Sequence, residues 1–265
     1  LAANPDINQA PLGPGAIQAR RRFAGTFPNL AALNLYRSVY ESWYDALQVQ
    51  FQRRLKDGLS FNTHYRLARA EQTVSTPWDA LVLERVATAG DNRHTWVGQV
   101  NYELPFGQSL TGIAHGFLAG WQVNAIANFQ TGSPFGVTNQ TARGNTGGGD
   151  RPNLVGDPVL PASERTQQRW FNTAAFVAQP QFTLGDSPAV VMHGPNQRRL
   201  DLSFFKDLTL SSTSRLQLRY EVYNVTNVVN FQNPVSALGS PDFGRLTSTG
   251  NSTPRQMQFA VRLFF

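Results

Sequence analysis

The chain has 265 residues, of which 41% are hydrophobic and only 15% are charged, against about 25% charged residues in an ordinary soluble domain. It contains no cysteine, so a disulfide framework and a thiolate metal site are excluded. The net charge is +6, but the basic residues are scattered apart from the run at residues 20–22. A nucleic-acid-binding protein would gather them on one face with aromatic platforms, so we expect no nucleic-acid partner.

The hydrophobic residues are spread along the chain rather than gathered in runs. No segment has the roughly 18 consecutive apolar residues of a transmembrane helix. Low charge without apolar runs suits either a soluble all-β protein or a transmembrane β-barrel, in which lipid-facing residues alternate with polar ones. The first 23 residues are rich in Pro, Gly and Asn, and we predict that they form a loop.

Alternation of apolar and polar residues recurs seven times after the opening loop. In the first segment, Leu47, Val49 and Phe51 alternate with glutamines, which is typical of a strand with one polar and one apolar face. Each segment is close to the 9–11 residues or so that a tilted strand needs to cross a bilayer. The predicted strands are residues 43–54, 59–70, 94–104, 120–131, 199–210, 215–225 and 256–265.

The connections between these strands are alternately short and long. Tight turns are predicted at 56–58 and 211–214, and the connection at 105–119 is intermediate, with a short amphipathic piece near 113–118. Outer-membrane barrels have this asymmetry, with short periplasmic turns and long extracellular loops. The long connections are residues 71–93, 132–198 and 226–254.

Aromatic residues lie at both ends of the predicted strands, as in the aromatic belts at membrane interfaces. The pattern favours an antiparallel transmembrane β-barrel segment, all-β, with about seven long strands in a curved open sheet. The alternative is a secreted or surface β-sandwich that binds glycans through loop aromatics such as Trp78 and Trp170. Lys206 falls on the lipid-facing side; either it reaches the interface at the short-turn end, or a bulge at Phe204–Phe205 shifts the register.

Five stretches follow one another along the chain: GWQVNAIANFQTGSPF, RPNLVGDP, RWFNTAAF, LDLSFFKDLTL and FGRLTSTGNSTPRQMQFAVRLFF. Together they resemble the C-terminal part of TonB-dependent outer-membrane receptors of the Oar-like branch, whose members carry a carboxypeptidase-regulatory-like domain. The resemblance covers most of the chain and keeps the order of the family's signatures.

This resemblance implies a localisation in the bacterial outer membrane and a role in energy-coupled uptake. Residues 1–42 are then an extracellular loop and residues 43–265 the spanning strands and loops, with the plug and signal peptide absent. The expected partners are outer-membrane lipid and lipopolysaccharide, the barrel-assembly machinery, TonB through the missing plug, and an unknown substrate. In the assembly signal at the C-terminus, the polar position is Gln258, Ala260 replaces the usual glycine, and Leu263 and Phe265 are the two final hydrophobic positions.

Residues for catalysis or cofactor binding are not indicated. The four histidines have no metal-ligand spacing, so we expect no enzyme activity, no metal and no cofactor. NTGGGD at 145–150 is interpreted as a flexible loop tip rather than an ion-binding loop. In the longest loop, ERTQQRWFNTAAF is predicted to form a short helix. The candidate substrate-contacting residues are Arg143, Asp150, Arg151, Trp170 and Phe171.

Overall fold

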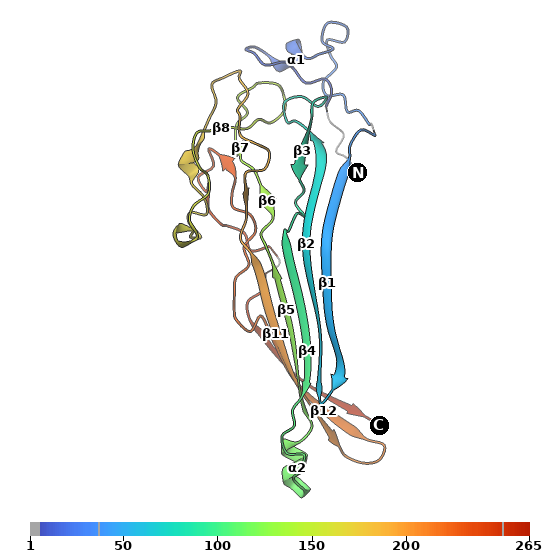
Figure 1. The fold of residues 1–265 in the computed structure, drawn as a ribbon. Coiled ribbons are helices and arrows are strands. Elements are labelled where there is room, and N and C mark those ends of the chain that lie inside the picture. Colours follow the sequence, from blue (N-terminus) through green and yellow to red (C-terminus); the bar gives the residue numbers. More distant parts are fainter. Residues whose placement is uncertain (1–5, 37, 251) are drawn as a thin grey trace.

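The computed structural model describes residues 6–36, 38–250 and 252–265. One large antiparallel sheet dominates it (Figure 1), with the spanning strands in the order β1-β2-β4-β5-β11-β12-β14 and β3 added beside β2. All seven predicted strands are present. Their bounds are β1 Ser42–Lys56, β2 Leu59–Ser75, β3 Leu83–Ala87, β4 His94–Glu103, β5 Trp121–Gln130, β11 Gln197–Thr209, β12 Arg215–Tyr223 and β14 Gln256–Phe264.

The remaining elements are short and lie in the connections. Three two-stranded sheets pair β6 with β10, β7 with β13 and β8 with β9. No helix in the described part of the chain is long and apolar enough to cross a membrane. The bounds are α1 Ile17–Arg20, α2 Gly112–Leu118, β6 Pro134–Phe135, β7 Thr138–Asn139, β8 Asn153–Leu154, η1 Ala162–Glu164, η2 Thr173–Ala175, β9 Phe176–Val177, β10 Met192–His193 and β13 Ala237–Leu238.

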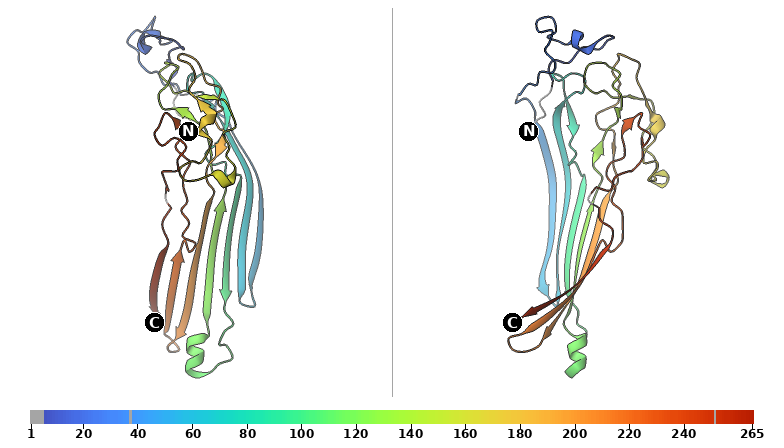
Figure 2. Two further views of the ribbon diagram at one scale, coloured as in Figure 1. Left: turned by 90° about the vertical axis from the view of Figure 1, so that its left-hand side faces the viewer. Right: turned by 180° about the vertical axis from the view of Figure 1, so that it is seen from behind.

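The sheet is curved and open. The long connections gather at one end of the strands, and α2 and the tight turns lie at the other end (Figures 1 and 2). Among the described residues, β1 and β14 each have one paired neighbour and do not pair with each other. The curved open sheet expected from the sequence is therefore confirmed. The β-sandwich alternative is wrong, because the described residues form no second large sheet that could pack against this one.

The tight turn after β1 shows why the two strands reverse there. Asp57 and Gly58 both have positive φ values, 54° and 74°, which is the backbone of the two-residue hairpin turns that match strand twist. A Cβ at position 58 would also lie 2.9 Å from the carbonyl oxygen of Glu103 on the neighbouring β4 connection. Only glycine satisfies both conditions without strain.

The connection at 71–93 departs from its predicted loop structure. β2 continues to Ser75 and pairs with β3, so that Gln72 lies opposite Val86. The predicted strand ended at Ala70 because the later residues, EQTVS, have no clear apolar alternation. The hairpin extends above the rest of the sheet at the long-loop end (Figure 1), where neither face needs to be apolar.

The register places apolar and polar residues on opposite faces of the sheet. One row across it joins Phe61, Val100, Ala125, Leu202 and Val222. The adjacent row on the other face joins Ser60, Asn101, Asn124, Ser203 and Glu221. Leu47, Val49 and Phe51 of β1 lie on the apolar side and are 51–65% exposed, as expected of side chains that face lipid.

Arg53, opposite Phe61, lies on the apolar face near the short-turn end, and so does Lys206. Lys206 pairs with Trp121 on one side and Leu218 on the other, so it does lie on that face. The bulge alternative is wrong, because the register of β11 with both neighbours runs without a shift through Phe204 and Phe205. The side chain is only 3% exposed, and its ammonium group donates to the carbonyl oxygen of Ala119 at the short-turn end.

We predict that arginine is costly on the apolar face at mid-strand and tolerated on the other face. Val100 lies midway between the row of Trp96 and the row of Trp121. In the membrane-inserted protein, Val100→Arg should therefore lower the free energy of unfolding by about 2–4 kcal/mol. The matched control is Gln99→Arg, one residue away on the polar face. Equal losses in a guanidinium titration of the two variants would contradict the orientation.

Candidate functional site in the long loops and the polar cavity below them

The long connections form a packed layer with its own hydrophobic core. Phe171 is 1% exposed, and its ring lies 5.8 Å from the ring of Phe135, 5.8 Å from Phe176 and 5.2 Å from Phe243. These aromatic residues come from two different connections, 131–196 and 224–255. Tilted and edge-on ring pairs at such distances stabilise the contact beyond the area buried. The loops are therefore held together before any ligand is bound.

The predicted helix around Trp170 and Phe171 is wrong. Only 3₁₀ turns occur there, at η1 and η2, and both aromatic residues lie between them. Trp170 instead donates from its backbone N–H to Gly244, and its indole donates to the carbonyl oxygen of His193 at 3.2 Å. Tertiary contacts of the aromatic rings with other segments replace the local helical hydrogen bonds.

Asp150 organises the backbone of the loop tip. Its carboxylate accepts hydrogen bonds from the backbone N–H of Arg143 at 2.5 Å, from that of Gly144 at 2.7 Å and from the amide of Asn139 at 2.5 Å. The residue is 1% exposed. NTGGGD is thus a packed turn rather than the free tip expected from its glycines, because a buried carboxylate must have its acceptor sites filled.

Arg143 and Arg151 are also engaged within the loop layer. Arg143 donates to the backbone carbonyl of Gln179. Arg151 is 7% exposed, forms a bidentate ion pair with Glu84 of β3, and lies with its guanidinium 5.1 Å from the centre of the Trp78 ring. A buried ion pair of this kind specifies how two segments dock. Here it joins the longest loop to the β2–β3 hairpin.

Among the five candidate substrate residues, Asp150, Arg151 and Phe171 are therefore buried, and their contacts shape the loops. Trp170 is half-buried and lies beside a cavity of about 190 Å³ that Val159, Arg165 and His193 also line. The Arg165 guanidinium lies 5.5 Å from the centre of the Trp170 ring. Direct substrate contact by these residues stays a prediction, and the buried ones would act through the shape of the loop.

A polar cavity of about 580 Å³ lies where the spanning strands meet the loops. Gln130, Gln197 and Arg199 contribute to it from the polar face of β5 and β11, while Asn233 and Thr249 line it from the connection after β12. Further lining residues are Ala89, Ser133, Pro195, Asn224, Asn230, Phe231, Gln232, Gly250, Ser252 and Thr253.

Some of these polar groups are used by the protein and others are not. Asn224 and Asn230 hold backbone groups of neighbouring segments. Within the described part of the chain, the side chain of Gln130 makes no hydrogen bond, and Gln232 uses only its oxygen, which accepts from Ser248. The cavity therefore offers amide donors and acceptors to a polar ligand. The sequence signal for it was the amide-rich run NVTNVVNFQN at 224–233.

Charges on the polar face are mostly paired along single strands. Arg199 lies 2.9 Å from Asp201, Arg219 lies 2.6 Å from Glu221, and Arg215 of β12 lies 3.7 Å from Asp207 of β11. These three arginines are thus balanced by carboxylates, whereas Arg66 and Arg262 on the same face form no ion pair with a described carboxylate. Among the described residues, no group of three or more His, Cys, Asp or Glu side chains is arranged to hold a metal ion.

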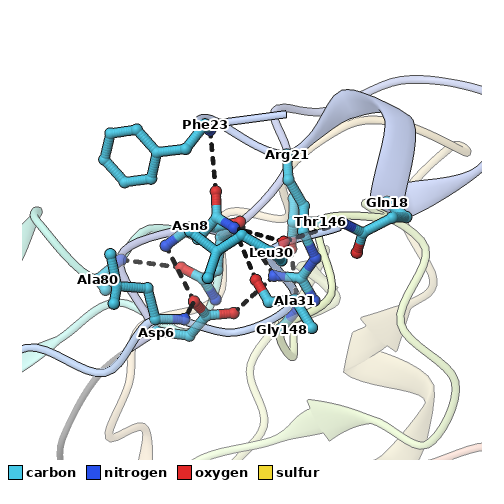
Figure 3. A network of polar contacts seen from close by, with 12 residues as sticks. Asp6, Asn8, Gln18, Arg21, Phe23, Leu30, Ala31, Ala80, Thr146 and Gly148 are labelled. Carbon is cyan, nitrogen blue, oxygen red and sulfur yellow. Dashed lines mark hydrogen bonds and ion pairs between the residues drawn. The ribbon is translucent and has the colours of Figure 1, made fainter. Parts of the chain in front are cut away.

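The segment before β1 folds over the loop layer and is fastened by a polar network (Figure 3). Asn8 is fully buried; its amide donates to the carbonyl oxygens of Leu30 and Ala31 and accepts from the N–H of Phe23. The backbone N–H of Ala10 donates to Thr146 of the longest loop. The N-terminal segment and the loops are therefore hydrogen-bonded to each other.

The arginine run at 20–22 is used inside this layer. Arg20 donates to the backbone of Pro11 and Asn145, Arg21 pairs with Asp6 at 2.9 Å, and Arg22 pairs with Asp79 at 3.1 Å. These three residues are therefore held by partners inside the protein. Contact of the protein with lipopolysaccharide stays a prediction.

Asp6 has a lowered pKa. Burial alone would raise the pKa of the carboxyl, but hydrogen bonds from the N–H of Leu33, from the Arg21 guanidinium and from the N–H of Asn8 outweigh it. The two N–H donors lie 2.8 and 2.9 Å from the Oδ1 atom. The charged form of Asp6 therefore stabilises the folded N-terminal segment.

The C-terminal strand presents the assembly-signal residues on its two faces. Gln258 lies opposite Glu221 and Ala260 opposite Arg219 on the polar face, while Leu263 lies opposite Leu216 on the apolar face. Phe265 follows the strand and is 97% exposed. The other edge of β14 has no partner among the described strands.

These features define an outer-membrane protein: long tilted strands, an apolar face for lipid, a polar face toward a lumen, short turns at one end and long packed loops at the other. A family model described as the outer membrane beta barrel domain matches residues 1–258. The chain belongs to this family, and its location is the bacterial outer membrane. No curated protein and no solved structure matches it.

Removing the Asp150 carboxylate should loosen the loop tip without affecting the barrel wall. Asp150→Ala leaves the N–H groups of Arg143 and Gly144 and the Asn139 amide without their acceptor, at a cost of about 1–3 kcal/mol for each buried group left unpaired. We expect faster amide hydrogen exchange at residues 139–150 and unchanged exchange in β5 and β11. Asp150→Asn, which keeps one acceptor oxygen, should have a smaller effect; equal protection in all three proteins would contradict this role.

Acid should release the N-terminal segment. Because the folded pKa of Asp6 is lowered, its stabilising contribution is complete above the ordinary value of 3.8 and is lost as the pH falls through the lowered value. Hydrogen exchange in residues 6–36, corrected for the intrinsic pH dependence, should increase as the pH falls below about 3.8 toward the lowered pKa. Asp6→Asn should show the faster exchange already at pH 5. A pH response that survives in this variant would assign the effect to another group.

Proposed function

We propose that this chain forms part of the wall and the extracellular loops of a TonB-dependent transporter that takes up a substrate across the outer membrane. The observation that supports this proposal most directly is the cavity with unused amide groups, which lies between the polar face of the sheet and a packed layer of long loops. A substrate captured by the loops would pass this cavity on its way into the lumen. The sequence resemblance to TonB-dependent receptors of the Oar-like branch agrees with this role.

The open sheet requires further strands to complete a barrel. Along the free edges of β1 and β14, backbone N–H and C=O groups have no partner in the sheet, and in hydrocarbon each such group costs several kcal/mol. We infer that additional strands pair with both edges. In a receptor of this class, a plug would then face the polar side of the sheet and receive energy through TonB.

The chain's own contribution to uptake is binding and confinement rather than a chemical reaction. The loop layer would capture substrate, the polar face would guide it, and the apolar face would contact lipid. We further propose that Gln258, Ala260, Leu263 and Phe265 are read by the barrel-assembly machinery. Leu263 lies on the apolar face, and Gln258 and Ala260 lie on the polar face, of an edge strand that pairs only with β12 among the described strands. Neither enzyme activity nor a cofactor is part of this proposal.

The proposal predicts a growth defect shared with loss of TonB. In the host, deletion of the complete gene and deletion of TonB should reduce growth on the same nutrient, and the double deletion should be no worse than TonB deletion alone. Complementation with Gln130→Leu should fail partly, because the leucine removes an unused amide from the cavity. Gln52→Leu, on the same face near the short turns, should complement fully. Additive defects on unrelated nutrients would contradict energy-coupled uptake.

A further inference from the structure

The connection between β4 and β5 differs from the other turns at its end of the sheet. Residues 104–120 contain no Asp, Glu, Lys or Arg, whereas the β1–β2 turn contains Lys56 and Asp57 and the β11–β12 turn is made mainly of serine and threonine. α2 lies in the middle of this connection and extends beyond the strands (Figure 1). A segment at the periplasmic end would be expected to be polar if it were surrounded by water.

Four of its large apolar side chains are exposed. Phe117 is 70% exposed, Phe106 is 63% exposed, Leu118 is 53% exposed and Leu110 is 41% exposed. The connection is nevertheless folded, because Gly107 lies against the end of the helix and its carbonyl oxygen contacts His115 at 3.1 Å. Four exposed large apolar residues on one ordered connection mark an interaction surface.

The end of α2 is fastened to the lipid-facing side of the sheet. The indole N–H of Trp121 donates to the carbonyl oxygen of Phe117 at 3.0 Å, and the ammonium group of Lys206 donates to that of Ala119. Trp121 and Lys206 are direct cross-strand neighbours on the apolar face, and the Lys206 ammonium lies 5.6 Å from the centre of the Trp121 ring. Both donors satisfy carbonyl groups that a helix leaves unpaired at its C-terminus.

This arrangement explains why a lysine interrupts the apolar face. A cation at the C-terminus of a helix interacts favourably with the helix dipole, and here the cation belongs to β11 rather than to the helix itself. The buried ammonium group of Lys206 thus ties α2 to the strand that faces lipid. The apolar surface of the sheet and that of the connection become continuous at Trp121.

We propose that the connection at 104–120 is an interfacial membrane anchor whose exposed apolar side chains enter the phospholipid head-group region of the periplasmic leaflet. The occupant is lipid because the surface continues the lipid-facing band, carries no charge that would oppose burial, and is held by groups of that band. Amphipathic helices lie in the plane of a membrane interface with their apolar side chains in the boundary between head groups and acyl chains. Lys206 and Trp121 are its positioning residues. The inference depends on the outer-membrane location and is independent of transport.

The absence of cysteine allows a direct test by site-directed spin labelling. Ala114→Cys in α2 would be labelled with a nitroxide in the complete barrel, with the strands that pair with β1 and β14 present, reconstituted in phospholipid vesicles. Collisions with oxygen and with a water-soluble nickel complex would be measured. Matched labels would be placed at Ser212→Cys in the polar β11–β12 turn and at Val49→Cys on the lipid-facing side. We expect the label at 114 to collide less often with the nickel complex and more often with oxygen than the label at 212 does. Both collision rates at 114 should be close to those of the label at 49.

Two outcomes would overturn the proposal. Nickel access at position 114 equal to that at 212 would show that α2 lies in water, and low access to both reagents would show that protein rather than lipid covers it. The positioning role is tested in the same background by Lys206→Met, which should increase the mobility and nickel access of the label at 114 while the label at 49 is unchanged. If Lys206→Met also changes the label at 49, the positioning role is tested instead with Trp121→Phe, which removes the indole N–H donor. An unchanged label at 114 in Trp121→Phe would then exclude a positioning role for these residues.

Discussion

The structure depends on one constraint: a backbone inside hydrocarbon must pair all its N–H and C=O groups, because no water is present to do so. The antiparallel ladder from β1 to β14 meets this requirement for each strand between its two neighbours. Once the ladder exists, side chains alternate between the faces, and one face must then be apolar. The rows of Val100 and of Asn101 show this separation on neighbouring residues.

Outside the membrane the same backbone groups are satisfied by different means. The loops have few ladders, and buried polar side chains replace them as partners. Asp150 accepts from two backbone N–H groups, and Asn8 bonds to three backbone groups of the N-terminal segment. These contacts give long irregular connections a defined shape, on which a site for a ligand can be built. The cavity beside Gln130 lies where the two kinds of structure meet.

At the opposite end of the sheet, Lys206 connects the strands with the irregular connection between β4 and β5. Its position on the apolar face would be unfavourable in mid-membrane, but it lies beside Trp121 and reaches the carbonyl oxygen of Ala119. The residue that interrupts the alternation therefore completes the hydrogen bonding of a helix end. A departure from a regular pattern here marks a specific contact rather than a fault in the register.

The sequence by itself determined the large sheet of spanning strands. Strict alternation at Leu47, Val49 and Phe51 and in the six other segments predicted the strands, their faces and the order of short and long connections, because burial against lipid on one side is a local condition that each strand meets separately. The sequence also indicated the short helix in the β4–β5 connection. β3 was missed because the residues it pairs with have no apolar alternation, and the pairing is visible only once the hairpin is folded.

Only the tertiary structure decided the roles of the loop residues. Phe171, Asp150 and the arginines at 20–22 look available for a ligand in the sequence, yet the protein uses them itself. Phe171 contacts Phe243, Arg22 pairs with Asp79, and Asp150 accepts from Asn139, which also donates to Gln179. The amide-lined cavity likewise assembles from two strands and three connections. Such contacts depend on how irregular segments dock, and no periodic sequence pattern encodes this docking. In the spanning strands, by contrast, every backbone group must pair within the sheet and every second side chain must suit lipid, so the pattern is visible in the sequence.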